Sequence, residues 1–429
     1  MSTRIETYLA KRADFETWPL AGASLDAPVK QVVAIPALAE YDNLFCTLAD
    51  LEGAPEDVRS ATLVVVVVNN GATADAAQAE NNRRTLERLA AHNAKLRLAW
   101  ADAASPGRTL PRKTGVGLAR KIGMDWGLRA LAQHGNEQGG LICLDADTHT
   151  GPEYLGCLHA FFSERPRWGA VVPYAHPLNG PAEEAAAVRC YELFMRCQEL
   201  ALDWAGSPYA YPSVGSAMAC SARAYAAVSG MNRRQAGEDF YFLQQLAKTG
   251  GIERVRGTVV HPASRPSDRV PFGTGRQVRR VLAGEEDPYL AYHPDSYRIL
   301  RDWLRIAIAR PDAPLHTLEE AAAAIDPELA AFLATQRFDE AWPRLQKNSG
   351  SAEAMQRRFH EWFDAFRTLK LLHHLRDHGY PRQDLFECMA AILVWRGESG
   401  PVAANAGLRG DTAGQTALLE HLRACCDRL

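Results

Sequence analysis

The sequence predicts an α/β protein, with a Rossmann-like, doubly wound sheet over residues 1–280 and an all-helical region over residues 281–429. Strand-like and helix-like segments alternate through the first 150 residues, which is typical of a sheet whose strands are joined by right-handed helical crossovers. After about residue 280, strand-like runs vanish and Ala, Leu, Glu and Arg dominate. We therefore expect two domains that meet near residue 280.

The first two strands are short apolar runs. Residues 32–35 form one run, which Pro36 ends, and residues 63–68 form another that contains five consecutive valines. A continuous β-branched run predicts a strand that is covered on both faces, as in a parallel sheet. The Asn-Asn-Gly turn at residues 69–71 ends the second strand.

The later elements follow from hydrophobic periodicity and from Gly or Pro at their ends. We expect strands at residues 96–100, 141–144, 170–173, 215–220 and 254–260, and helices at residues 75–93, 114–133, 183–203, 222–228 and 238–249. In the C-terminal region, aromatic residues recur at helical spacing, and the adjacent His373 and His374 are interpreted as packing or surface residues.

The composition is that of an ordinary soluble globular protein, with 429 residues, 47% hydrophobic and 23% charged. The formal net charge of −3 and the lack of a basic run argue against a nucleic-acid partner. No stretch approaches the roughly 18 apolar residues of a spanning helix, and the N-terminus lacks an apolar signal core. Nine scattered cysteines fit a reducing cytosol, so we expect a cytoplasmic protein without a transmembrane segment; its oligomeric state stays open.

Two carboxylates, Asp145 and Asp147, lie one residue apart where the predicted strand at residues 141–144 ends. Ligands of an open parallel sheet collect at the carboxyl ends of its strands. Carboxylate oxygens are the ligands that Mg²⁺ and Mn²⁺ prefer. The pattern therefore predicts a site for Mn²⁺ or Mg²⁺ that carries a diphosphate.

Six short segments share an order with one known family. They are residues 35–40 (Ile-Pro-Ala-Leu-Ala-Glu), 69–71 (Asn-Asn-Gly), 113–123 (Lys-Thr-Gly-Val-Gly-Leu-Ala-Arg-Lys-Ile-Gly), 145–147 (Asp-Ala-Asp), 215–218 (Gly-Ser-Ala-Met) and 237–239 (Gly-Glu-Asp). In this order they resemble the family-2 nucleotide-sugar glycosyltransferases of the GT-A fold, over roughly residues 30–280. The resemblance implies a mixed α/β sheet and a metal-dependent hexosyltransferase that moves a sugar from a nucleotide-diphospho-sugar to a hydroxyl acceptor.

The resemblance also implies where the nucleotide would bind. The loop from Pro36 to Glu40 would lie beside the base, and Asn69 and Asn70 would contact the base or the ribose. Relatives usually carry an Asp in this turn, so the amides here keep an acceptor but lose a charge. A plain turn after a strand is the alternative interpretation.

Basic and glycine residues are expected to hold the diphosphate. At the start of the predicted helix 114–133, Lys113, Gly117 and Arg120 combine backbone donors with cations, and Lys121 stands where relatives commonly carry Asn. A second set, Arg265, Arg269 and Arg276, falls in a loop rich in Pro, Ser, Gly and Thr that resembles a flexible lid. These arginines could hold the diphosphate or an anionic acceptor; a solvated basic loop is the alternative.

The remaining candidates carry the chemistry. Asp145 and Asp147 would hold the metal, and His261, at the end of the last predicted core strand, would complete its ligands as a late histidine does in several GT-A enzymes. Asp239 would be the general base of a single inverting displacement, with Glu238 beside it to orient the acceptor. Acids in a first helical turn are also favoured by the helix dipole alone.

Three alternatives stay open at this point. A retaining GT-A enzyme that makes a glycerate-type glycoside would also use the paired aspartates and the late histidine. A non-catalytic protein that binds nucleotide-sugars also stays open, because the Asn-Asn turn departs from the Asp that relatives usually carry there. A sugar-phosphate nucleotidyltransferase would need a glycine-rich basic loop after the first strand, and residues 36–40 contain neither glycine nor a basic residue.

Overall fold

The computed structural model describes residues 3–71, 73–266, 273–398 and 407–429. The chain divides into two compact units, an α/β unit of residues 1–185 and 213–279 and a helical unit of residues 186–212 and 280–429. The division near residue 280 lies where the strand-like runs end in the sequence. Residues 186–212, expected within the core domain, group instead with the helical unit.

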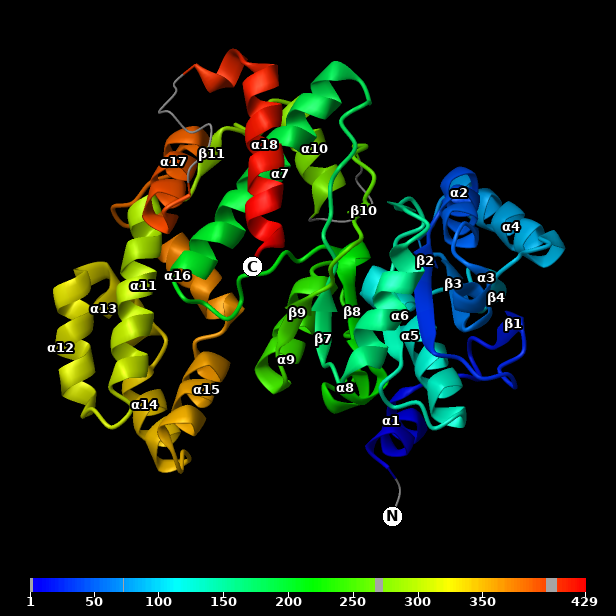
Figure 1. The fold of residues 1–429 in the computed structure, drawn as a ribbon, viewed down its shortest axis with the longest axis horizontal. Coiled ribbons are helices and arrows are strands. Elements are labelled where there is room, and N and C mark those ends of the chain that lie inside the picture. The colour runs from blue at the N-terminus through cyan, green and yellow to red at the C-terminus, as the bar shows by residue number, and fades with distance from the viewer. Residues whose placement is uncertain (1–2, 72, 267–272, 399–406) are drawn as a thin grey trace. The chain divides into compact units, whose positions relative to one another are not determined.

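An eight-stranded mixed sheet forms the centre of the α/β unit, in the order β1-β4-β3-β2-β5-β8-β7-β9 (Figure 1). Its strands are β1 (Leu20–Gly22), β2 (Gln31–Ala37), β3 (Thr62–Asn69), β4 (Arg97–Ala103), β5 (Gly140–Cys143), β7 (Gly169–Val171), β8 (Met218–Ser221) and β9 (Ile252–Arg254). The four strands from β4 to β5 in this order are parallel, whereas β8 is antiparallel to both of its neighbours. The predicted α/β class with a doubly wound, mixed sheet is confirmed.

The helices of the α/β unit alternate with these strands. They are α1 (Arg4–Arg12), α2 (Tyr41–Glu52), α3 (Glu56–Ser60), α4 (Ala76–Ala91), α5 (Val116–Gln133), α6 (Tyr154–Glu164), α8 (Ala222–Ala227) and α9 (Glu238–Thr249). Helix α10 (Thr274–Leu282) follows at the end of the unit. Helices α1, α2, α3, α6 and α10 and strand β1 were not predicted from the sequence.

Close packing of α5 on the sheet depends on two glycines. A Cβ atom on Gly123 would lie 2.9 Å from the Cβ of Ala34, and one on Gly127 would lie 2.8 Å from Cδ2 of Leu141. Larger side chains would push the helix away from β2 and β5. These glycines therefore place the start of α5 close to the carboxyl ends of the central strands.

The five valines of β3 are all completely buried, as their continuous run predicts. They pair in parallel register with β2 on one side and β4 on the other. Burying each such side chain contributes about 1.5–3 kcal/mol relative to an exposed one. The strand is thus a central element of the core.

Several predicted strand bounds are wrong: residues 215–217 of the strand predicted at 215–220 form a 3₁₀ turn, and β4 extends to Ala103. Pro36 does not end β2 but lies within it, opposite Val67 of β3. The neighbour on the other side, β5, pairs with β2 only as far as Ala34, so β2 has a single partner at Pro36, where a missing N–H is tolerated. The predicted strand at residues 254–260 is two short strands, β9 and β10 (Val260–His261), and β10 pairs with β6 (His149–Thr150).

Helices make up nearly all of the helical unit, as predicted. They are α7 (Ala182–Trp204), α11 (Pro294–Ala309), α12 (Leu315–Ile325), α13 (Pro327–Thr335), α14 (Phe338–Lys347), α15 (Ala352–Trp362), α16 (Ala365–Asp377), α17 (Leu385–Arg396) and α18 (Thr412–Asp427). One pair of two-residue strands, β11 (Leu290–Ala291) and β12 (Gln383–Asp384), is the exception. Trp303, Trp342 and Phe359 are buried in one aromatic core, which explains the helical spacing of aromatics in the sequence.

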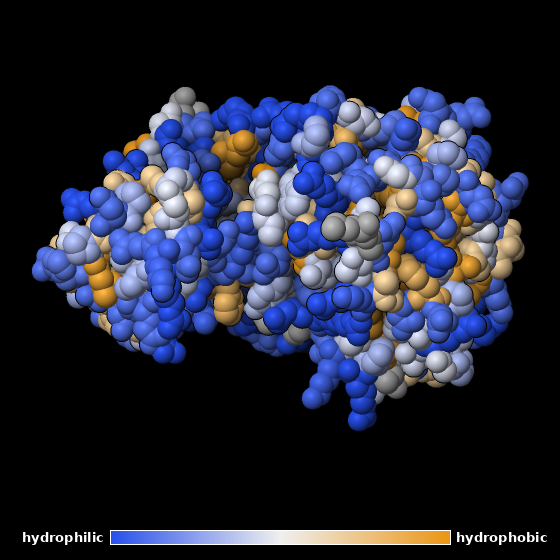
Figure 2. Space-filling view, turned by 90° about the horizontal axis from the view of Figure 1, so that it is seen from below, coloured by the Kyte–Doolittle hydropathy of each residue, from blue (hydrophilic) through white to orange (hydrophobic). Residues whose placement is uncertain are grey.

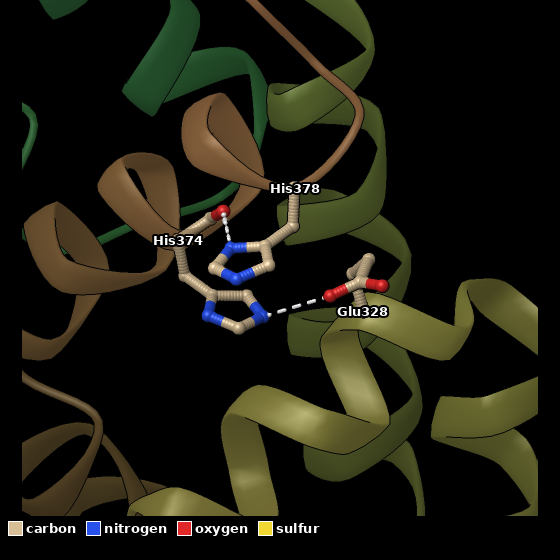
Figure 3. A group of neighbouring side chains, drawn as sticks. All are labelled: Glu328, His374 and His378. Carbon is tan, nitrogen blue, oxygen red and sulfur yellow. Dashed lines mark hydrogen bonds and ion pairs between the residues drawn. The ribbon is translucent and has the colours of Figure 1, made fainter.

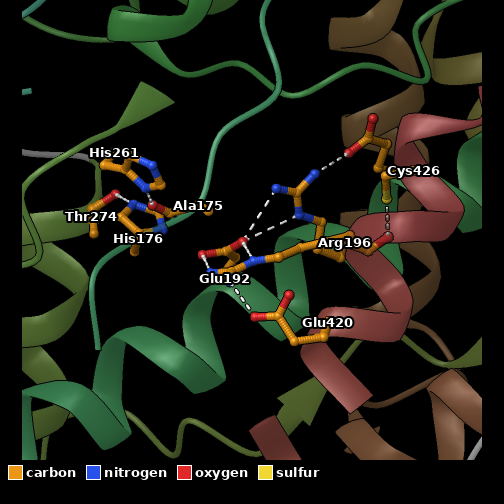
Figure 4. A network of polar contacts seen from close by, with 10 residues as sticks. Ala175, His176, Glu192, Arg196, His261, Thr274, Glu420 and Cys426 are labelled. Carbon is orange, nitrogen blue, oxygen red and sulfur yellow. Dashed lines mark hydrogen bonds and ion pairs between the residues drawn. The ribbon is translucent and has the colours of Figure 1, made fainter. Parts of the chain in front are cut away.

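A buried charge network joins α7 to α18 inside the helical unit (Figure 4). Both oxygens of Glu192 accept hydrogen bonds from Arg423, from Nε at 2.8 Å and from Nη2 at 2.9 Å. Arg196, one turn along α7, donates to Glu192 at 3.2 Å. Because Glu192 and Arg196 are buried, removing a partner would leave an uncompensated buried charge.

Polar residues cover most of the face that Figure 2 shows, with apolar residues scattered between them. Among the described residues, the exposed large hydrophobic side chains are Leu282, Phe366 and Val394. Within the same part of the chain, no helix has both the length and the apolar character needed to cross a membrane.

Candidate functional site

Two adjacent central strands, β2 and β5, end at the same edge of the sheet because they are parallel. The loop after β2 carries Glu40, and the loop after β5 carries Asp145 and Asp147. The fold thus brings three carboxylates to the edge where open α/β sheets bind ligands. This is the placement that the Asp-x-Asp pattern predicts.

Arg120 on α5 links two of the predicted motifs. Its guanidinium group donates from Nη2 to Oδ1 of Asp145 and from Nη1 to Oε1 of Glu238, the first residue of α9. The side chain of Arg120 is only 4% exposed, and that of Glu238 is also 4% exposed. Burial alone would lower the pKa of Arg120, but the two carboxylates raise it above its ordinary value. Arg120 therefore stays charged and ties together residues that lie far apart in the chain.

A serine completes the contacts of Asp145. Ser216 Oγ donates to Oδ2 of Asp145 at 2.5 Å, and Thr148 Oγ1 donates to the same serine oxygen at 2.9 Å. Ser216 lies in the 3₁₀ turn Gly215–Ala217 just before β8. Both oxygens of Asp145 thus have protein partners that hold the carboxylate in one orientation.

The second aspartate, Asp147, belongs to a neighbouring group of charged side chains around Arg265. Nη2 of Arg265 lies 2.7 Å from Oδ2 of Asp147 and also donates to Oε1 of Glu40. Asn43 holds the other oxygen of Glu40 at 2.6 Å. Arg265 is 41% exposed, in contrast to the buried Arg120, so this contact lies at the open side of the site.

The donor set fits a divalent cation. Burial, followed by the carboxylates of Glu40 and Asp145, raises the pKa of Asp147 above its ordinary value. Arg120 with its two carboxylates, Arg265 with its two carboxylates, and Asp239 together make five carboxylates but only two guanidinium groups. This leaves an excess of negative charge. Oxygen donors with excess negative charge suit Mg²⁺ or Mn²⁺.

His261 lies next to this loop through strand pairing. In the β6–β10 pair, His261 is opposite His149, which follows Asp147 by two residues. Nδ1 of His261 is 2.8 Å from the carbonyl oxygen of Ala175 (Figure 4). A carbonyl oxygen only accepts, so Nδ1 carries the proton and Nε2 keeps its lone pair. This is the arrangement typical of a histidine that binds metal through Nε2.

The two acids that open α9 differ in their partners. Glu238 is occupied by Arg120, and burial together with Asp239 raises its pKa to about 7 against the opposing effect of Arg120. Asp239 accepts a hydrogen bond from the backbone N–H of Phe240 at Oδ1, at 2.7 Å. The backbone N–H of Asp239 itself is a further hydrogen-bond donor to this carboxylate, and both backbone donors lower its pKa. Burial is the main cause that raises the pKa of Asp239.

The Asn-Asn turn after β3 is held from α4. Nδ2 of Asn82 donates to the carbonyl oxygen of Asn69, at 2.9 Å, and to Oδ1 of Asn70. Oδ1 of Asn82 accepts from the backbone N–H of Ala39, at 2.8 Å, and Nδ2 of Asn70 donates to Ala104 O, at 3.1 Å. An Asp at position 70 would lack the donor for Ala104, which explains the amide in structural terms. Among the described residues, Oδ1 of Asn69 is buried without a partner.

We expect Asn82→Ala to destabilise the protein by about 2–4 kcal/mol, because it leaves several buried polar groups of the two loops without partners. Chemical denaturation measures the free energy of unfolding. Asn93→Ala, at an exposed asparagine, is the matched control and should change stability by less than about 0.5 kcal/mol. Equal stability of the two variants would show that Asn82 does not hold the turn.

The other predicted residues lie in varied surroundings. Lys113 is exposed and adopts a positive φ of 65°. The backbone N–H of Gly117 donates to the carbonyl oxygen of Arg234 at 3.1 Å, so in this structure it is not available to the expected diphosphate. Arg276 lies in α10, and Arg269 lies outside the described residues.

Lys121 has a structural role. Its ammonium group is buried and lies 2.6 Å from Asp125 Oδ2 and 2.6 Å from the hydroxyl oxygen of Tyr8. Tyr225 also donates to Asp125, at 2.8 Å. Burial lowers the pKa of Lys121 below its ordinary value, although Asp125 opposes this change. The network joins α1, α5 and α8 beneath the site.

Sequence reasoning did not assign roles to Ser216 and Asn82. Ser216 was part of a quoted segment, but nothing in its spacing indicates a contact with Asp145. Asn82 lies within a polar helix, where an asparagine that faces the sheet cannot be told from one that faces solvent.

No protein family model and no curated protein matches this chain. Solved structures do match. Residues 1–349 of TarS from S. aureus, in complex with UDP-GlcNAc, align with a TM-score of 0.40 and 14% identity over 79% of this chain and 92% of that chain. The mannosyltransferase PcManGT from Pyrobaculum calidifontis, in complex with GDP-Man and Mn²⁺, aligns with a TM-score of 0.34 and 14% identity over 99% and 92%. GalNAc-T7 with UDP, GalNAc and Mn²⁺ aligns with a TM-score of 0.36 and 13% identity over 70% and 55%.

Proposed function

We propose that the protein is a metal-dependent glycosyltransferase that moves a sugar from a nucleotide-diphospho-sugar to a hydroxyl acceptor, with inversion at the anomeric carbon. The observation that carries this proposal is the buried Arg120, which joins Asp145 of the Asp-x-Asp loop to Glu238 at the start of α9. The candidate metal and diphosphate site is thereby joined to the start of α9, whose second residue, Asp239, is the candidate base.

Donor binding would use the carboxyl edge of the sheet. Asp145, Asp147 and His261 would hold Mn²⁺ or Mg²⁺, which acts as a Lewis acid that neutralises charge on the departing diphosphate. Arg265, already beside Asp147, is available for a phosphate once its carboxylate partners bind the cation. The unpaired Oδ1 of Asn69 offers an acceptor for an N–H group of the base.

Proton transfer would fall to Asp239 rather than Glu238. Glu238 is bound to the guanidinium group of Arg120, whereas the hydrogen-bond donors to the Asp239 carboxylate are backbone N–H groups. A carboxylate whose pKa lies above its ordinary value is a stronger base at neutral pH. It would take the proton of the acceptor hydroxyl while that oxygen attacks the anomeric carbon and the nucleoside diphosphate leaves. In this role Glu238 acts through Arg120 and positions the start of α9.

All nine cysteines are free thiols. Free thiols are typical of a reducing compartment, which supports the expected cytoplasmic location.

We expect the product of the first turnover to have the anomeric configuration opposite to that of the donor sugar. Proton NMR of the glycoside formed from an active donor and acceptor measures its anomeric configuration directly. A product with the donor's own configuration would favour the retaining alternative and remove Asp239 from the role of base. Donor binding without transfer or hydrolysis would favour a non-catalytic binding protein.

A further inference from the structure

Three side chains in the helical unit form a cluster that the glycosyl-transfer chemistry does not use. Glu328 lies in the first turn of α13, His374 in the last turn of α16, and His378 directly after α16 (Figure 3). One potential ligand atom of each lies within 4.8 Å of the others. We propose that Glu328, His374 and His378 bind a transition-metal cation of the zinc class, which clamps α13 to α16.

The spacing of the two histidines suits one cation. His378 directly follows the last residue of α16, and its imidazole ring stacks on that of His374 with centroids 4.2 Å apart (Figure 3). Nδ1 of His378 is 2.8 Å from the carbonyl oxygen of His374. A carbonyl oxygen only accepts, so the proton of His378 lies on Nδ1 and the lone pair on Nε2 is left for a metal.

The third ligand lies at a suitable distance. Nε2 of His374 is 3.1 Å from Oε2 of Glu328. Two ligand atoms that are each about 2.0–2.2 Å from zinc in tetrahedral geometry lie roughly 3.3 Å apart. The observed pair therefore needs only a small separation to hold the ion, which would replace the proton that His374 now shares with the carboxylate.

Access and ligand type both favour zinc over the cation of the sugar-transfer site. His378 is exposed, whereas Glu328 and His374 are partly buried, so an ion can enter and keep a water molecule as a fourth ligand. Imidazole ligands suit Zn²⁺, Co²⁺ and Ni²⁺, whereas Mg²⁺ prefers oxygen atoms. The two sites should therefore bind different metals.

A second cluster of potential ligands, Glu398, His421 and Cys425, is a weaker candidate. Nη2 of Arg428 lies 2.7 Å from Oε2 of Glu398 and 3.2 Å from Sγ of Cys425. A guanidinium group thus occupies the place that a cation would take. By contrast, no described cation has a contact with the three residues of the first cluster.

The test uses the full-length protein, stripped of metal by a chelator and then dialysed into excess Mg²⁺ to saturate the oxygen-rich site. Calorimetric titration with Zn²⁺ should show one tight site, and its affinity should fall by at least about 100-fold in His374→Ala and in His378→Ala. His316→Ala, at an exposed histidine on α12, is the control and should bind as the wild type does. Equal zinc isotherms for the wild type and the double variant His374→Ala/His378→Ala would overturn the proposal.

Two further readouts identify the site. Zinc at a concentration about 100-fold above its Kd should raise the Tm of the wild type by roughly 3 °C, but not that of the double variant. Co²⁺ should bind at the same stoichiometry with visible bands and without a thiolate charge-transfer band. Such a thiolate band would place the metal on Cys425 and contradict the assignment.

Discussion

Asp239→Asn is expected to lower the rate of sugar transfer by about 10²–10⁴ while leaving the affinities for donor and metal unchanged. The substitution keeps the size of the side chain and its hydrogen bond from Phe240 N, but removes the oxygen that can accept a proton. Calorimetry with the donor and turnover with the acceptor measure the two effects separately. In the wild type, the rate should also fall as the pH falls through the raised pKa of Asp239, because only its ionised form is a base.

A control separates base chemistry from a general effect of charge at a helix start. Asp57 is exposed in the first turn of α3, so Asp57→Asn removes a similar charge away from the site. It should leave turnover within about twofold of the wild type, since a surface substitution changes little. Loss of donor affinity in Asp239→Asn would make the residue structural or a metal ligand, and unchanged turnover would remove it from catalysis.

Arg120→Met should destabilise the protein by about 3–5 kcal/mol, because it leaves Glu238 buried without its cation and deprives Asp145 of a donor. Methionine matches the length of the arginine stem, so the change tests charge more than volume. Denaturant unfolding measures the loss. Arg223→Met, at an exposed arginine on α8, should cost less than about 0.5 kcal/mol.

A double variant checks the physical reason for this loss. In Arg120→Met/Glu238→Gln, the buried carboxylate becomes neutral, so part of the lost stability should return. If Glu238→Gln instead lowers the free energy of unfolding of Arg120→Met further, as an independent substitution would, the uncompensated charge is not the cause of the lost stability.

The core of the fold could be predicted because its signals are local. Five consecutive valines are typical of a strand that is covered on both faces, and Gly123 and Gly127 lie within a clear helical segment. Local signals failed where tertiary pairing decides the outcome. Pro36 stays in β2 because β5 ends early and leaves no second partner there. The six residues after Arg254 divide between a loop and β10, because β6 pairs with β10.

Three of the predicted site residues lie together in the structure, but the sequence did not predict which of them touch. The family resemblance implied that Arg120, Asp145 and Glu238 share a site, because their motifs follow one another in the family's order. Which of them touch depends on side-chain direction, which spacing does not encode. Arg120 was therefore assigned to a diphosphate, although it lies buried between two carboxylates. His374 shows the same limit, because only the fold brings Glu328 beside it.

Calorimetric titration with a panel of nucleotide-diphospho-sugars, with Mn²⁺ and with excess chelator, tests most directly whether this is a nucleotide-sugar glycosyltransferase. At least one sugar donor should bind in the presence of Mn²⁺, and chelation should weaken its binding by at least about tenfold. Asp145→Ala and Asp147→Ala, folded as judged by circular dichroism, should lose this metal-dependent affinity and all turnover. If no donor binds, or if binding is the same in chelator and in both variants, the carboxylates at the end of β5 are not a sugar-nucleotide site.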